Sequence, residues 1–97
     1  MTVGACRITL RLPENASLKG KRQVIKSITA RVRNRYNVSI AEIDDQDKWQ
    51  IASLGISCVS NSGRHAADTL TNVAGFIRGS RLDVEVLDCQ TELLEAL

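Results

Sequence analysis

The 97-residue chain is poor in aromatic residues, proline and histidine, and it has no long hydrophobic run. Charged residues make up 25% of the sequence. They interrupt every apolar segment well before the ~18–20 residues that are needed to span a bilayer. The first twelve residues place Arg7 and Arg11 inside an apolar run and lack the basic start and small-residue cleavage site of a signal peptide. We therefore expect a cytoplasmic protein that does not associate with membranes.

The residues that usually carry metal or catalytic chemistry are few and scattered. Cys6, Cys58 and Cys89 show no CxxC spacing, so neither a zinc site nor a disulfide framework is predicted, and each cysteine is expected to act as a small buried hydrophobe. The only histidine, His65, has no triad partner nearby in the sequence. The acidic turn that begins at Asp44 lacks the downstream Gly and Glu of an EF-hand loop. The sequence thus predicts no catalytic residues, no metal and no cofactor, and an enzyme is the least favoured function class.

Only three aromatic residues are present: Tyr36, Trp49 and Phe76. None falls at a predicted outward position of the first or third strand, where RNA-recognition motifs stack bases on aromatic rings. That mode of RNA binding is therefore excluded. For Trp49 two interpretations stay open, because its ring either covers the open end of the core or serves as an exposed anchor for a partner.

The formal net charge of +2 conceals two halves of opposite sign. Residues 1–40 contain nine basic residues and one acidic residue, a balance of +8, whereas residues 41–97 contain four basic and ten acidic residues, a balance of −6. Such asymmetry is typical of proteins that bind polyanions, although folding can bring the two halves together again.

Hydrophobic periodicity predicts six main elements and a short helix at the end of the chain. Period-two alternation indicates strands, helical spacing indicates amphipathic helices, and serines stand at plausible helix starts. The expected elements are a strand over 3–12, a helix of about five turns capped by Ser17, strands over 37–44 and 50–60, a helix capped by Asn61 or Ser62 and closed by Gly79, a strand over 82–88, and a short terminal helix within 90–97.

The β-α-β-β-α-β order predicts an α+β fold in which residues 1–97 form a single ferredoxin-like domain. Right-handed crossovers and a short connection between the second and third strands lead to a four-stranded antiparallel sheet with both helices on one face. The other sheet face is then open to a ligand, an RNA or a second subunit. The residues expected on that face are Arg7, Thr9, Arg11, Ser53, Gly55, Ser57, Asp83 and Glu85.

The first helix carries the strongest functional signal, because it is strongly basic and contains no acidic residue. Cations at a helix N-terminus oppose the helix dipole, so a function other than helix stability is expected to favour them. They either bind phosphate groups or pair with acids of the second half such as Asp83, Glu85 or Asp88. The candidate phosphate-binding residues are Lys19, Lys21, Arg22, Lys26 and Arg33, with Arg7 and Arg11 as further candidates.

Several segments together resemble the YlxP-like family of small bacterial proteins. Its characteristic strings, SLK-x-KR and DQD-x-WQ, stand here as Ser17–Arg22 and Asp45–Gln50. The resemblance implies a ferredoxin-like fold and, since no catalytic residues are established for the family, little chemistry. Genes of the family often lie beside those of translation initiation and ribosome-maturation factors, which implies an association with RNA or the ribosome. The similar segments are Val3-Gly4, Arg7–Pro13, Ser17–Arg22, Arg33–Ser39, Ala41–Gln50 and Leu54–Ile56.

Two functional hypotheses follow from the sequence. The first is a non-enzymatic accessory factor that contacts RNA or a ribosomal subunit through the phosphate-binding residues above, without reading bases. The second is a homodimeric or small-ligand-binding module that uses the open sheet face, where Arg7 and Arg11 pair with acids instead of RNA. The candidate partner contacts are Trp49, Ser53, Gly55 and Ser57.

Overall fold

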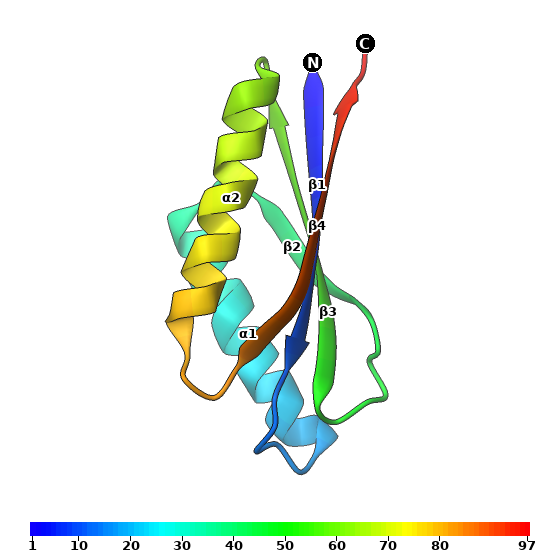
Figure 1. The fold of residues 1–97 in the computed structure, drawn as a ribbon, viewed down its shortest axis with the longest axis vertical. Helices are drawn as coiled ribbons and strands as arrows, with labels where there is room; N and C mark the ends of the chain where they lie inside the picture. Colours follow the sequence, from blue (N-terminus) through cyan, green and yellow to red (C-terminus); the bar gives the residue numbers. More distant parts are fainter.

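The computed structural model describes all 97 residues as a four-stranded antiparallel sheet with two helices on one face (Figure 1). In the sheet the strands lie in the order β2-β3-β1-β4. The β-α-β-β-α-β order and this topology confirm the predicted ferredoxin-like fold. The elements are β1 (Thr2–Arg11), α1 (Leu18–Arg35), β2 (Ser39–Asp44), β3 (Ile51–Ser60), α2 (Gly63–Ser80) and β4 (Glu85–Glu95).

The centre of the sheet is β1, which pairs with β3 on one side and with β4 on the other. Its even-numbered side chains point toward the helices, and Ile8 and Leu10 are completely buried there. The alternation read from the sequence is therefore the alternation of the pleat, since successive side chains of a strand point to opposite faces. One cluster of 18 buried hydrophobic residues joins the inner face of the sheet to both helices.

Both helices begin at the serines that the sequence offers as caps. The Ser17 hydroxyl accepts a hydrogen bond from the backbone N–H of Gly20, and the Ser62 hydroxyl accepts one from that of His65. Each cap satisfies an N–H group that would otherwise lack a partner in the first turn. Both helices bury one apolar side, as expected of amphipathic helices, with Ile28 in α1 and Leu70 in α2 among the largest buried side chains.

The last segment of the chain differs from the sequence prediction. A short helix was expected within 90–97, but β4 continues through this region to Glu95 and pairs with the whole length of β1. A helix there would leave this edge of β1 without a hydrogen-bonding partner from Thr2 to Arg7, and unpaired backbone groups are costly. In Figure 1 the two termini accordingly lie at the same end of the molecule, and Met1 and Ala96 exchange backbone hydrogen bonds.

The start of the last strand also lies later than predicted. Leu82, expected to point into the core, is fully exposed in a turn before β4. Asp83 lies in the same turn, where its carboxylate accepts hydrogen bonds from the Arg81 guanidinium at 2.8 and 2.9 Å. Asp83 is therefore outside the sheet and does not pair with Arg7 or Arg11. Inward alternation begins at Val84, which is buried.

Neither α1 nor α2 combines the length and the apolar character that a membrane-crossing helix needs.

Candidate functional site

One side of α1 presents an exposed row of cations, which we call the cationic face. It consists of Lys19, Arg22, Lys26 and Arg33, all of which are exposed. Their spacings of three, four and seven residues place them along one side of the helix, and from first to last they extend about 21 Å at 1.5 Å per residue. The helix itself contributes no acidic residue that would neutralise them.

The acids of the second half do not neutralise the cationic face either. Five ion pairs are present in the molecule, and none involves a member of this face. These four side chains therefore do not pair with Asp83, Glu85 or Asp88, which was the alternative left open by the sequence. The ion pairs are Arg7–Asp44, Arg11–Glu85, Lys21–Glu42, Lys48–Asp45 and Arg81–Asp83.

The other cations of α1 are directed toward neighbouring elements. Arg31 donates a hydrogen bond to the carbonyl oxygen of Ser80 at the end of α2. Arg35 lies over the ring of Phe76, with 5.3 Å between its guanidinium carbon and the ring centroid, a cation–π arrangement. Within the cationic face, Arg33 is anchored to the edge strand β2 by a 2.8 Å hydrogen bond to the carbonyl oxygen of Ile40. The remaining donors of this guanidinium have no protein partner.

Lys21 has a different environment from its neighbours and corrects the sequence prediction. Its side chain is 0% exposed, and its ammonium group lies 2.9 Å from a carboxylate oxygen of Glu42. The same nitrogen donates to the carbonyl oxygens of Asp45 at 2.7 Å and Ile51 at 3.1 Å. Two hydrogen bonds and one ion pair thus hold the ammonium group inside the protein, and the Glu42 oxygen Oε2 is buried with this ion pair as its polar contact. Lys21 is therefore not part of the cationic face and is not available to phosphate.

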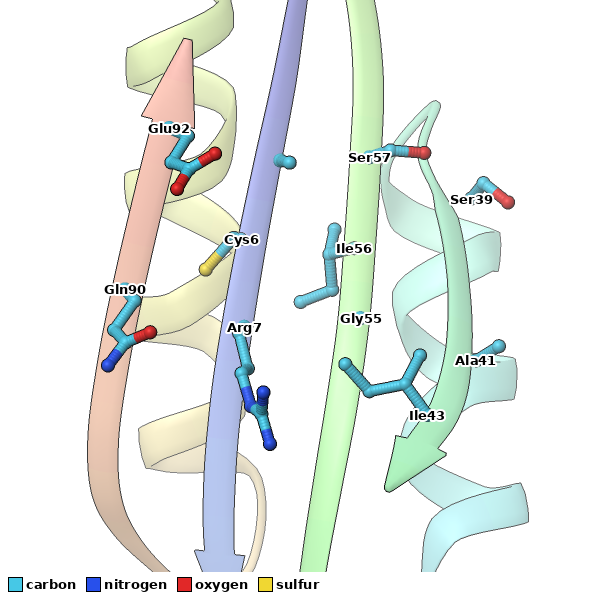
Figure 2. A pocket seen from close by; sticks show the side chains of 11 residues that line it. Cys6, Arg7, Ser39, Ala41, Ile43, Gly55, Ile56, Ser57, Gln90 and Glu92 are labelled. Carbon is cyan, nitrogen blue, oxygen red and sulfur yellow. The ribbon is translucent and has the colours of Figure 1, made fainter.

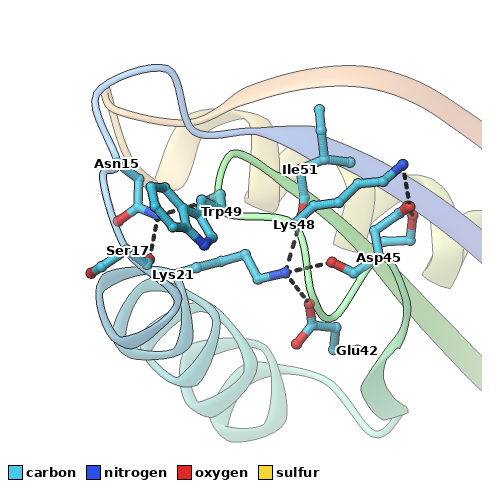
Figure 3. Close-up of polar contacts among 9 residues, drawn as sticks. Asn15, Ser17, Lys21, Glu42, Asp45, Lys48, Trp49 and Ile51 are labelled. Carbon is cyan, nitrogen blue, oxygen red and sulfur yellow. Dashed lines mark hydrogen bonds and ion pairs between the residues drawn. The ribbon is translucent and has the colours of Figure 1, made fainter.

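Lys21 is the centre of a polar cluster that joins the start of α1 to the connection between β2 and β3 (Figure 3). We call this cluster the junction. It brings together the two characteristic strings, Ser17–Arg22 and Asp45–Gln50, which are far apart in the sequence. The residues of the junction are Asn15, Ser17, Lys21, Glu42, Asp45, Lys48, Trp49, Gln50 and Ile51.

Asn15 provides the second link of the junction. Its side-chain amide donates to the carbonyl oxygens of Ser17 and Trp49 (Figure 3). Gln50 reinforces this link, because its amide donates to the carbonyl oxygens of Pro13 and Asn15, each at 3.2 Å. Asn15 and Glu42 were not among the site residues predicted from the sequence. No local pattern marks them, since their partners come from distant segments.

The Asp45 carboxylate holds the turn from the other side. Asp45 has a positive φ of 63°, which an aspartate tolerates better than most residues. Its carboxylate lies 3.1 Å from the Lys48 ammonium and accepts a 2.8 Å hydrogen bond from the Ser53 hydroxyl. These contacts, that with Lys48 first, hold the pKa of Asp45 below its ordinary value of 3.8. Ser53 is consequently buried beneath the turn, which corrects its prediction as an exposed partner contact.

The open sheet face contains a shallow groove of about 450 Å³ (Figure 2). Gly55 lies in its floor, partly covered by Ile43, while Ser57 is exposed. Arg7 lies beside the groove and pairs with Asp44 at 2.7 Å. The groove is lined by Ala5, Cys6, Arg7, Ser39, Ala41, Ile43, Gly55, Ile56, Ser57, Gln90 and Glu92.

The predicted site residues therefore divide between separate regions. Arg11 lies on the open sheet face like Arg7, with its guanidinium 3.9 Å from the Glu85 carboxylate. Both arginines are thus on the face opposite the helices and do not extend the cationic face. Trp49 lies at the junction and is exposed.

The cysteines offer no metal site, because no group of three or more His, Cys, Asp or Glu side chains lies close enough together to hold an ion. Cys6 and Cys58 are buried as expected, whereas Cys89 is half-buried on β4. The sulfur atoms of Cys6 and Cys89 are 3.6 Å apart. Burial raises the pKa of the Cys6 thiol to about 11, so it is protonated at neutral pH. A protonated thiol is a poor nucleophile.

The segments that meet at the junction also match a known family. The family model described as "Protein of unknown function (DUF503)" matches residues 3–91. The chain belongs to the DUF503 family. It is similar to "Uncharacterized protein YlxP" of Bacillus subtilis (strain 168), with 51% identity over 61 residues, which cover 63% of this chain and 66% of that protein. The predicted resemblance to the YlxP-like family is thereby confirmed. Neither the family description nor the name of the Bacillus protein states an activity.

Proposed function

We propose that this DUF503 protein is a non-enzymatic cytoplasmic accessory factor whose cationic face binds the phosphate backbone of RNA, such as that of a ribosomal subunit. The observation that supports this function is the absence of any ion pair at Lys19, Arg22, Lys26 and Arg33, although ten acids occur in the second half of the chain. An unpaired row about 21 Å long is long enough to follow several successive phosphates.

The position of the cations on the helix supports the same proposal. Lys19 and Arg22 lie in the first turns of α1, where the helix dipole disfavours positive charge by about 0.3–1 kcal/mol per group. They contribute no ion pair that would offset this cost. A polyanion bound along the helix would offset it. Because the face contains no aromatic ring and no fixed array of side-chain amides, we expect backbone contacts without sequence-specific readout.

The test is the binding of a structured RNA hairpin and of isolated ribosomal subunits across a salt series. The double charge reversal R22E/K26E is compared with R64E/R78E, which makes the same change in net charge at exposed positions of α2. We expect R22E/K26E to weaken binding by at least about tenfold and to lower the salt slope by roughly 1.4–1.8, at about 0.7–0.9 per lost phosphate contact. Equal losses in both variants, or no binding of the wild type at low salt, would contradict the proposal.

A second candidate function is self-association through the open sheet face. The groove favours it, because the large side chains Gln90 and Glu92 on β4 stand on the opposite side from the small Ser39 and Ala41 on β2. Consider a two-fold axis that runs parallel to the strands and lies above the open sheet face, over the gap between β1 and β3. This axis would place the large side chains of one copy over the small side chains of the other. Such a contact would be isologous, as in most homodimers.

Sedimentation equilibrium at high micromolar concentration tests this second candidate. The wild type is expected to be dimeric. Ser57→Arg, in the groove, is expected to dissociate the dimer, whereas Thr71→Arg, at an exposed position of α2, is expected to leave it intact. If the wild type is monomeric throughout the concentration range, this second candidate is wrong, and the proposal for the cationic face is unchanged.

A further inference from the structure

The single tryptophan of the chain is exposed and has no aromatic or cationic partner. Trp49 is 56% exposed, although tryptophan is highly buried on average in folded proteins. The ring–ring and cation–π contacts of the molecule involve Tyr36, Phe76 and Arg35 only. Trp49 lies outside the hydrophobic core cluster, so it does not serve mainly as a cover for the core, and its interpretation as an exposed anchor stays a prediction.

The backbone that carries Trp49 is fixed from several directions. Its own carbonyl oxygen accepts a hydrogen bond from Asn15 (Figure 3). The next residue, Gln50, accepts a 2.8 Å hydrogen bond from the backbone N–H of Leu12, and the preceding residue, Lys48, donates its N–H to Asp45. An exposed aromatic ring on an ordered backbone loses little conformational entropy when a ligand binds, which is the condition for a preorganised contact.

The junction also places this ring at one end of the cationic face. Asn15 binds both the carbonyl oxygen of Trp49 and that of Ser17, the N-cap of α1. Lys19, the first member of the cationic face, follows Ser17 by two residues. Trp49 therefore lies at the N-terminal end of α1, which is also the end where the cationic face starts.

We propose that Trp49 is a stacking platform for one unpaired base of a single-stranded RNA whose adjoining phosphates contact Lys19 and Arg22. This inference rests on the proposed function of the cationic face and names the class of RNA it takes. Aromatic rings next to cations are the usual construction of single-strand binding surfaces, because every base has a π-face. The other residues of the turn, Asp45–Lys48 and Gln50, are all polar or charged. A protein interface usually has an apolar centre, whereas the Trp49 ring is a single aromatic group among polar residues. This arrangement suits a planar base better than it suits a protein partner.

The test uses the fluorescence of Trp49, which is the only tryptophan and so reports on its own site. The protein is titrated with a twelve-nucleotide single-stranded RNA, with an RNA duplex of the same length, and with inorganic polyphosphate as a probe of charge alone. We expect the single strand to quench the indole at saturation and polyphosphate to bind without quenching. Trp49→Ala is expected to weaken single-strand binding roughly 5- to 150-fold, with an unchanged salt slope, and Trp49→Phe is expected to recover part of the loss.

The outcomes separate the two proposals. If the single strand binds but Trp49→Ala binds it equally well, or if saturation leaves the fluorescence unchanged, the stacking platform is wrong and the cationic face stands. If neither RNA nor polyphosphate binds at low salt, both proposals are wrong. Asn15→Ala is the matched variant that keeps the indole and frees its backbone. Asn15→Ala is expected to weaken the binding of the single strand more than the binding of polyphosphate. An equal loss of affinity for both ligands would contradict the role of Trp49 as a fixed platform.

Discussion

Lys21 and its neighbours Lys19 and Arg22 belong to the same six-residue string, yet they have opposite environments. The Lys21 side chain is 0% exposed, and its ammonium group donates hydrogen bonds to the carbonyl oxygens of Asp45 and Ile51 and forms an ion pair with Glu42. Lys19 and Arg22 are exposed and form no ion pair. The comparison shows that residue type alone does not separate structural from surface cations, because one basic string supplies both.

Position on the helix does separate them. Lys21 precedes Ile25 by four residues and Ile28 by seven, so it lies on the buried stripe of α1. Lys19 and Arg22 lie on the adjacent side of the helix. A lysine on an apolar stripe must either extend its ammonium group to solvent or find partners inside, and the junction supplies the partners.

The largest expected effect is the loss of the buried cation. Lys21→Met leaves Glu42, whose side chain is only 17% exposed, without its counter-ion. It also removes a donor from two backbone carbonyls of the junction. Breaking a buried ion pair from one side costs about 3–5 kcal/mol in the free energy of unfolding, because an uncompensated charge stays behind. Urea unfolding followed by circular dichroism measures this change.

Two variants sharpen this first prediction. Lys19→Met makes the same chemical change two residues away at an exposed position and is expected to alter the free energy of unfolding by less than about 0.5 kcal/mol. The double variant K21M/E42L removes both charges and is expected to be more stable than K21M, since apolar replacements of a whole buried pair are often tolerated. Similar losses for Lys19→Met and Lys21→Met would contradict the distinction between the two environments.

The second prediction concerns two helical glycines, one that contacts residues of the junction and one that lies far from it. A Cβ at Gly20 would contact the Asn15 side chain, whereas a Cβ at Gly75 in α2 meets no atom within 4 Å. Gly75→Ala is therefore expected to raise the free energy of unfolding by about 0.5–1 kcal/mol through helix propensity. Gly20→Ala is expected to gain nothing, because displacing Asn15 loses hydrogen bonds of about 1 kcal/mol.

Thermal and urea unfolding of both glycine variants, together with acrylamide quenching of Trp49, checks this prediction. Gly20→Ala should make the indole more accessible to acrylamide, because Asn15 no longer fixes its carbonyl, and Gly75→Ala should leave quenching unchanged. Equal stabilisation by the two substitutions, with unchanged quenching, would mean that Asn15 does not hold the turn.

Most of the fold was predictable because it rests on local periodicity. The alternation in β1, the serine caps at Ser17 and Ser62 and the stripe of α2 are properties of short windows, and all are confirmed. The terminal strand was not predictable in this way. Within 90–97 the adjacent Leu93 and Leu94 break strict alternation, and only the free edge of β1 decides in favour of a strand.

The candidate site was predictable only in part, for a related reason. The cationic face follows from helical spacing, but its lack of ion pairs depends on where distant acids lie. The burial of Lys21 had a signal in its place on the apolar stripe, whereas Glu42 and Asn15 had none. Ser53 alternates outward as expected, yet the turn at Asp45 folds over it and buries it.

The third prediction contrasts the buried ion pair with an exposed one. Arg7 and Asp44 are 2.7 Å apart, close to the 2.9 Å of Lys21 and Glu42, but their side chains are about half exposed. Water screens their attraction, so a double-mutant cycle of Arg7→Gln and Asp44→Asn is expected to give a coupling energy of about 0.2–1 kcal/mol. A coupling equal to that of the Lys21–Glu42 cycle would show that distance matters more than burial.

The smallest expected effect belongs to the carboxylate that holds the turn of the junction. The pKa of Asp45 is lowered by Lys48 and Ser53, so as the pH falls past its ordinary value of 3.8 the unfolded chain takes up this proton before the folded chain does. The contribution of this group to stability is therefore complete above that pH and is lost as the pH falls through the lowered pKa of the folded state. Asp45→Asn keeps a residue that tolerates the positive φ but removes the titration, so its stability should depend less on pH in the acid range than that of the wild type. Urea midpoints measured at a series of pH values compare the two curves. Parallel curves would show that Asp45 contributes to the turn only as a hydrogen-bond acceptor, and that the buried charge of the junction resides in Lys21 and Glu42 alone.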